Sequence, residues 1–102
     1  MTLTVIDKIT GAGVIQFSPA NTAPDLTDYD DNGLYFRTAP SDILQGALLG
    51  ELIAGDGNAT LGILALDDPY GTGLADTVTQ SFTDSGGEIV GGEAVIYDPN
   101  AT

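Results

Sequence analysis

Apolar and polar residues follow one another in blocks that predict a strand, a loop and a helix in the second half of the chain. Residues 61–66 are mostly apolar, and two carboxylates and a Pro-Tyr-Gly corner follow them. Beyond the corner, Leu74, Val78 and Phe82 stand at the spacing of one stripe along a helix. A strand that is apolar on successive positions is typical of parallel sheets covered by helices. Ligands of such sheets bind at the carboxyl ends of the strands, which is where residues 67–72 lie.

The remaining segments extend this alternation along the chain. They are predicted as a helix over residues 3–9, strands over residues 14–17 and 34–38, a helix that begins after Ser41 and ends at Gly55, and a last strand over residues 89–97 that bends at Gly91 and Gly92. From residue 34 onward strands and helices alternate, which predicts right-handed crossovers and a parallel sheet. The helix after Ser41 has an apolar face formed by Ile43, Leu44, Ala47, Leu48, Leu52 and Ile53.

Composition narrows the class of protein. A chain of 102 residues has room for one domain with a modest core, and its 42% apolar content argues against disorder. It has no cysteine and no histidine. Disulfides, thiolate or imidazole metal sites and histidine-dependent catalytic triads are therefore excluded.

The charge balance is strongly acidic. Fifteen Asp and Glu residues stand against Lys8 and Arg37, a net charge of −13, so we expect no nucleic-acid partner and no anionic membrane. Such a charge suits a salty or extracytoplasmic setting. No apolar run approaches the roughly 18 residues of a membrane span.

For Arg37, a structural pair with Asp42 or another acid is favoured over a ligand carboxylate.

Two acidic clusters suggest a divalent cation. Asp28, Asp30 and Asn32 match ligand positions of an EF-hand loop, but its last position holds Ala39 instead of a bidentate Glu. The pair Asp67–Asp68 follows a strand, as magnesium-binding carboxylates of receiver domains do, but no lysine follows Lys8. Solvated turns are the favoured interpretation. The alternative stays open that this is a small acidic α/β protein that binds Ca²⁺ or Mg²⁺ at one of these places.

Three motifs resemble those of the substrate-binding proteins of ABC importers, in particular the branched-chain amino-acid (Leu/Ile/Val-binding) branch with its type I periplasmic-binding fold. The first covers residues 13–27 (GVIQFSPANTAPDLT), the second residues 35–46 (YFRTAPSDILQG) and the third residues 67–75 (DDPYGTGLA). They occur in the order and spacing of that family over nearly the whole chain. The resemblance implies an α/β fold of three layers, a parallel sheet with helices on both faces.

The resemblance also implies a domain organisation. The family has two lobes joined by crossing strands, with the ligand between them, and this chain is similar to the middle of such a protein. Residues 1–40 would then be the end of lobe one with a crossing strand, and residues 41–102 the first half of lobe two. The opening residues do not resemble a signal sequence, and we expect a segment of a longer protein. Unpaired sheet edges would allow a homodimer of the segment.

The family's head-group turn maps onto the residues after Ser18 and Pro19. The resemblance implies that backbone groups of Ala20 and Asn21 and the hydroxyl of Thr22 bind the carboxylate and ammonium of an amino acid, and that Tyr70 covers it from lobe two. Ser18 is also suited to cap its own turn.

The implied function is the binding of an amino-acid solute, outside the cytoplasm in the periplasm or at the cell surface, for the permease subunits of an ABC importer. No catalysis, metal or cofactor is expected. The 102-residue segment alone is expected to bind weakly or not at all.

Overall fold

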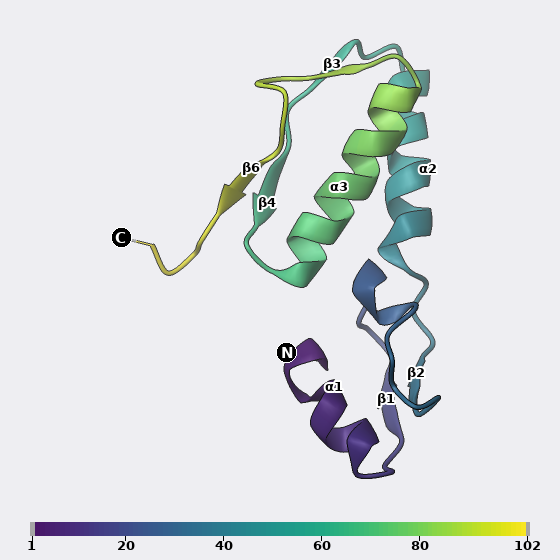
Figure 1. Cartoon of the computed structure of the whole chain (residues 1–102). Helices are drawn as coiled ribbons and strands as arrows, with labels where there is room; N and C mark the ends of the chain where they lie inside the picture. Colours follow the sequence, from purple (N-terminus) through teal and green to yellow (C-terminus); the bar gives the residue numbers. More distant parts are fainter. Residues whose placement is uncertain (1, 102) are drawn as a thin grey trace. The chain divides into compact units, whose positions relative to one another are not determined.

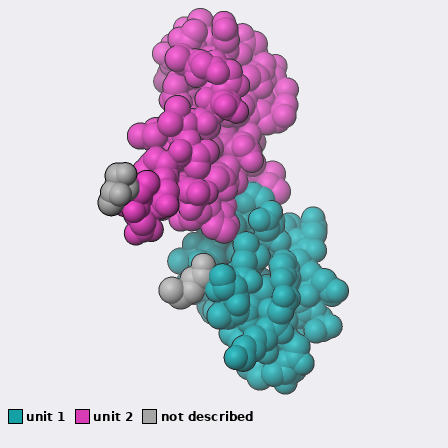
Figure 2. All heavy atoms as spheres, turned by 60° about the vertical axis from the view of Figure 1, so that its left-hand side comes forward, with its two compact units in different colours: residues 1–41 teal, residues 42–102 magenta. Residues whose placement is uncertain are grey.

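The computed structural model describes residues 2–101, and the chain divides into two compact units, Met1–Ser41 and Asp42–Thr102 (Figure 2). The elements of the first unit are α1 (Thr2–Gly11), β1 (Gln16–Ser18), the 3-10 helix η1 (Pro24–Leu26) and β2 (Tyr35–Arg37). Those of the second are α2 (Asp42–Gly55), β3 (Thr60–Leu61), β4 (Leu64–Leu66), α3 (Pro69–Asp84), β5 (Glu88–Ile89) and β6 (Val95–Tyr97). The assignment of these units to two lobes stays a prediction.

The first unit is built on a pair of short parallel strands. β1 and β2 pair with Gln16 opposite Tyr35 and Ser18 opposite Arg37. Helix α1 packs beside β1 (Figure 1). A small apolar core joins the helix, the strands and η1, and its buried members are Ile6, Ala23, Leu26 and Tyr35, with Leu3 and Tyr29 packed against them. This core fixes the loop that follows β1, because Ala23 and Leu26 belong to that loop.

The second unit holds two further parallel pairs, β3 with β5 and β4 with β6. The α/β class with parallel strands is confirmed. The single strand predicted over residues 61–66 is wrong in detail, because the chain leaves the ladder at Gly62 and Ile63 and forms β3 and β4 instead. The last strand likewise divides into β5 and β6. Its predicted bend is confirmed, since Gly91 and Gly92 both have positive φ angles, 80° and 85°, which favour glycine.

Helix α3 begins at Pro69 and buries the predicted apolar stripe. Val78 is 6% exposed and Phe82 is fully buried, and Ala75 at 4% is buried more deeply than its neighbour Leu74. Helix α3 packs along its length against α2, with β4 on another side (Figure 1). Burial of a phenylalanine of this kind stabilises a fold by about 2–3 kcal/mol.

The contact between α2 and α3 does not use the leucine-rich side of α2. Its buried members include Gly46 and Gly50, while Leu44, Leu48 and Leu52 are 57%, 58% and 61% exposed. The glycines allow close approach, and hydroxyls of α3 bind carbonyl oxygens of α2, as in the bond from Ser81 Oγ to the Ala47 carbonyl at 2.6 Å. The apolar face predicted for α2 is therefore present, but it is an exposed stripe in this structure.

Candidate functional site

The turn after β1 is organised by Ser18. Its Oγ accepts hydrogen bonds from the backbone N–H groups of Ala20 and Asn21, at 3.3 and 3.0 Å, so the predicted capping by Ser18 is confirmed. The strand ends here because Pro19 offers no N–H to a ladder. Ser18 itself is 9% exposed, and both bonds are partly buried. The sequence thus folds into a tight turn whose amide hydrogens point back to the strand.

The predicted ligand-binding residues of this turn differ in which of their hydrogen-bonding groups lack a partner within the protein. The N–H groups of Ala20 and Asn21 are engaged by Ser18, and the Asn21 side-chain amide donates to the Thr2 hydroxyl on α1. Thr22 is half-buried, and the structure gives it no hydrogen-bond partner among residues 2–101. The hydroxyl and N–H of Thr22 are therefore available to a ligand, whereas the amide hydrogens before it are already used. Whether any of the three binds a ligand stays a prediction.

Arg37 holds the far side of the same loop. One guanidinium nitrogen, Nη1, donates to the Ala23 carbonyl at 2.8 Å, and Nη2 donates to Thr27 Oγ1 at 2.7 Å. Within the described residues of its own unit, the hydrogen bonds of Arg37 thus go to a carbonyl and a hydroxyl, and not to an acid; the favoured pair with Asp42, which belongs to the other unit, stays a prediction. Arg37 bridges neutral oxygens of its own unit, which a planar five-donor fork does well.

The first acidic loop is organised by a residue that the cation hypothesis did not use. Asp31 Oδ1 accepts from the Gly33 N–H at 2.8 Å and Oδ2 from the Tyr35 N–H at 3.1 Å. Asn32, one of the suggested cation ligands, has a φ of 55°, the left-handed conformation that asparagine tolerates in turns. Asp31 therefore shapes the turn that leads into β2.

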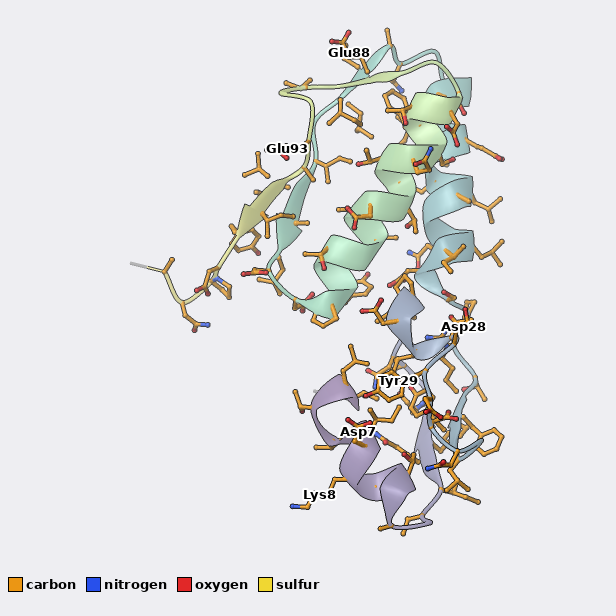
Figure 3. All side chains as sticks on the ribbon, viewed as in Figure 1. Asp7, Lys8, Asp28, Tyr29, Glu88 and Glu93 are labelled. Carbon is orange, nitrogen blue, oxygen red and sulfur yellow. The ribbon has the colours of Figure 1, made fainter. Side chains whose placement is uncertain are left out.

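A second polar contact ties this loop to α1. The Tyr29 hydroxyl donates to Asp7 Oδ1 at 2.8 Å, and Figure 3 shows the two side chains together. This hydrogen bond, with the negative charges of Asp7 and Asp30 beside it, raises the pKa of Tyr29 above its ordinary value of 10.0. Within residues 2–101, no three acidic side chains come together in a group that could hold a metal ion.

In the second unit, Asp68 caps the helix that carries Tyr70. Asp68 Oδ1 accepts from the Gly71 N–H at 2.6 Å, which satisfies one of the unpaired donors of the first helical turn. The second suggested cation pair therefore has one carboxylate in a structural role. Since α3 begins at Pro69, Tyr70 lies in its first turn and not in a loop as predicted.

Tyr70 stands at an apolar groove within the second unit. Its side chain is 51% exposed. The groove has a volume of about 430 Å³ and is lined by residues of α2, α3 and the β3–β4 segment, among them Leu49, Ile53, Leu66, Leu74 and Val78. An aromatic ring with a polar hydroxyl at the edge of an apolar surface is suited to cover a partly apolar molecule.

No helix among the described residues is both long and apolar enough to cross a membrane.

The chain is similar to solved proteins of one class, the substrate-binding proteins of ABC transporters. Residues of this chain superpose on such a protein from Desulfitobacterium hafniense with a TM-score of 0.73 at 30% identity, covering 99% of this chain and 29% of that one. The structure of an ABC transporter substrate-binding protein from the same organism in complex with Leu gives a TM-score of 0.76 at 32% identity, covering 97% and 29%.

A curated relative points to a particular branch of this class. It is the leucine-, isoleucine-, valine-, threonine- and alanine-binding protein of Pseudomonas aeruginosa, 35% identical over 75 residues, which are 72% of this chain and 20% of the relative. No family model matches the chain. The chain thus spans about a fifth of the curated relative and less than a third of the solved structures. The resemblance to the branched-chain amino-acid branch of ABC substrate-binding proteins is confirmed.

The residues that shape the turn carry weaker signals in the sequence than those expected to touch a ligand. For Arg37, the net charge of −13 favours an acidic partner. Its bond to a backbone carbonyl depends on where the loop folds, and no spacing in the sequence indicates it. A useful signal was the Ser-Pro pair at the end of a strand, which indicates a turn closed by the serine side chain.

Proposed function

We propose that this chain is a segment of a non-enzymatic, extracytoplasmic protein that binds an amino acid for an ABC importer and delivers it to the permease subunits. The observation that carries this proposal is the similarity of 97% of the chain to a substrate-binding protein solved with Leu. The curated relative, whose name specifies five aliphatic or small amino acids, supports the same class of ligand. In this proposal residues 1–40 come from lobe one and residues 41–102 from lobe two.

The proposed contacts divide between the two units. In the first unit Thr22 offers a hydroxyl and an N–H, and Ala20 and Asn21 offer carbonyl oxygens, all suited to the charged head group of a free amino acid. Removing a zwitterion from water is unfavourable unless each charge gains such partners. In the second unit Tyr70 would cover the ligand from the side of its apolar groove.

A chimaeric protein tests the ligand assignment. The present 102 residues replace the matching segment of the Desulfitobacterium hafniense protein that was solved with Leu, and leucine binding is measured by calorimetry. We expect the chimaera to bind leucine, and Thr22→Ala to lower the affinity at least about tenfold, since hydrogen bonds to charged groups are worth about 1.5–3 kcal/mol. Tyr70→Ala is also expected to lower the affinity, because the ring no longer covers the ligand. Thr60→Ala and Tyr97→Ala, at exposed positions, serve as matched controls.

The outcomes separate the parts of the proposal. A folded chimaera that does not bind leucine would contradict the ligand, and unchanged affinity in both Thr22→Ala and Tyr70→Ala would remove the site assignment. For the 102-residue chain alone we propose weak or absent binding, because it spans 29% of the solved proteins. Micromolar affinity of the chain alone would contradict this.

We also propose that the isolated chain forms a homodimer. Its exposed apolar stripe, Leu44, Leu48 and Leu52, gains by being covered. The net charge of −13 opposes association, so we expect the dimer fraction to rise with salt. Light scattering after gel filtration measures this. A monomer at high salt, or a dimer unaffected by Leu48→Lys, would contradict the proposal.

A further inference from the structure

Two residues that lie opposite each other in the first sheet reach into the same loop from its two ends. Ser18 and Arg37 are register partners, and each is the last residue of its strand. Because parallel strands end at the same edge of a sheet, both side chains start beside the loop of residues 19–27. Ser18 accepts hydrogen bonds from amides at the start of that loop, and Arg37 donates to oxygens in its middle and at its end.

Thr22 lies between the points that these two side chains hold. Before it, the N–H groups of Ala20 and Asn21 bind Ser18 Oγ, and after it, the Ala23 carbonyl binds Arg37 Nη1. The side chain of Ala23 is 7% exposed and belongs to the core, which fixes this end further. Thr22 is thus flanked by fixed neighbours while its own polar groups have no partner among residues 2–101.

We propose that Ser18 and Arg37 are positioning residues, a pair at the strand ends that holds the turn so that the N–H and hydroxyl of Thr22 stay free for a ligand. The inference rests on the proposed amino-acid binding function and adds two residues that do not touch the ligand. A pre-formed turn lowers the entropy lost on binding, because the loop need not be ordered when the ligand arrives. Arg37 is suited to this role since its fork reaches a carbonyl and a hydroxyl at once, which the single ammonium of lysine does less well.

The positioning is tested first on the 102-residue chain, without ligand. Amide hydrogen exchange is followed by NMR in Ser18→Ala, with Ser18→Thr as the conservative variant that keeps the hydroxyl and Ser85→Ala as a control serine in the second unit. We expect exchange at Ala20 and Asn21 to accelerate about fivefold in Ser18→Ala, as for the loss of a bond worth about 1 kcal/mol, and to return toward the original rate in Ser18→Thr. Equal rates in all variants would overturn the role of Ser18.

The role of Arg37 is tested by a substitution that conserves its charge, with a control substitution at Lys8. Arg37→Lys keeps the charge and loses the fork, and Lys8→Gln removes the chain's other cation, whose side chain extends away from α1 (Figure 3). We expect Arg37→Lys to accelerate exchange in the loop of residues 19–27 and to shift the methyl resonance of Thr22, and Lys8→Gln to do neither. If Lys8→Gln accelerates exchange in this loop as much as Arg37→Lys does, the acceleration does not come from the loss of the Arg37 fork and the positioning role is refuted.

Leucine binding by the chimaera then links the turn to the ligand. Ser18→Ala and Arg37→Lys are expected to lower leucine affinity about tenfold at temperatures where circular dichroism shows both variants fully folded, and Ser18→Thr to restore it. Unchanged affinity in a chimaera that binds leucine would overturn the positioning role and leave the proposed function intact. A folded chimaera that fails to bind leucine would overturn the proposed function and, with it, the link between the turn and a ligand. The exchange experiment would still decide whether Ser18 and Arg37 hold the turn.

Discussion

The close contact between α2 and α3 makes a sharp prediction about Gly50. A Cβ atom placed on Gly50 would lie 2.6 Å from the Ser81 Cβ and 2.8 Å from the backbone nitrogen of Phe82. Both atoms belong to the neighbouring helix, and a backbone nitrogen within a helix does not move aside alone. Gly50→Ala must therefore push the two helices apart.

The expected change in the free energy of unfolding is the balance of three contributions, two destabilising and one stabilising. Overpacking of a tight contact costs about 1–3 kcal/mol. Alanine favours a helix interior over glycine by about 1 kcal/mol. Separation of the helices also weakens the bond from Ser81 Oγ to the Ala47 carbonyl, worth about 1 kcal/mol. The net expectation is a loss of about 1–3 kcal/mol in the free energy of unfolding, or a fall of Tm by about 4–8 °C for each kcal/mol in a domain of this size.

Gly55 provides the matched control. It is the last residue of the same helix, and a Cβ placed on it has no atom within 4 Å. Gly55→Ala should be neutral or stabilise the chain by up to about 1 kcal/mol. Urea unfolding followed by far-ultraviolet circular dichroism measures both variants. If Gly50→Ala is as stable as Gly55→Ala, the two helices do not approach each other as the structure shows.

Two further predictions concern a helix cap and a tyrosine. Asp68→Ala should lower the free energy of unfolding by about 1 kcal/mol, because α3 loses its N-terminal cap. Asp68→Asn keeps a capping oxygen and should lower it by less. Equal urea midpoints of the two variants would argue against capping. Since the Tyr29 pKa is raised by its bond to Asp7, the contribution of Tyr29 to stability is fully present below about pH 10 and is lost as pH rises through the folded-state pKa. Absorbance titration of tyrosinate should show this late-ionising group disappear in Tyr29→Phe and persist in Tyr97→Phe.

Local pattern was sufficient for most of the fold. The apolar stripe of α3, the strand ends at Pro19 and the bend at Gly91 and Gly92 all follow from residues a few positions apart, and the structure contains each of them. Periodicity and turn chemistry act at that range. The pattern does not predict the division of residues 61–66 into two strands, because an apolar run indicates that a segment is buried but not where its ladder is interrupted.

The sequence does not indicate which side of α2 packs against α3, for a different reason. Hydrophobic pattern points to Leu44, Leu48 and Leu52, yet the contact is made by glycines whose value is the absence of a side chain. On a scale of helix propensity, a glycine lowers the expected stability of a helix. Only the position of Ser81 on the other helix shows that Gly50 is required there.

The candidate site shows the same limit at longer range. Thr22 could be singled out from its motif, but the reason it remains free depends on Ser18 and Arg37, which are 19 positions apart in the sequence and meet only because β1 and β2 pair in one register. A slip of that register by one residue would turn Arg37 to the opposite face of the sheet and leave the Ala23 carbonyl without its donor. The availability of Thr22 is thus a property of strand pairing, so changes that shift the register should alter the turn even when every residue of the turn is kept.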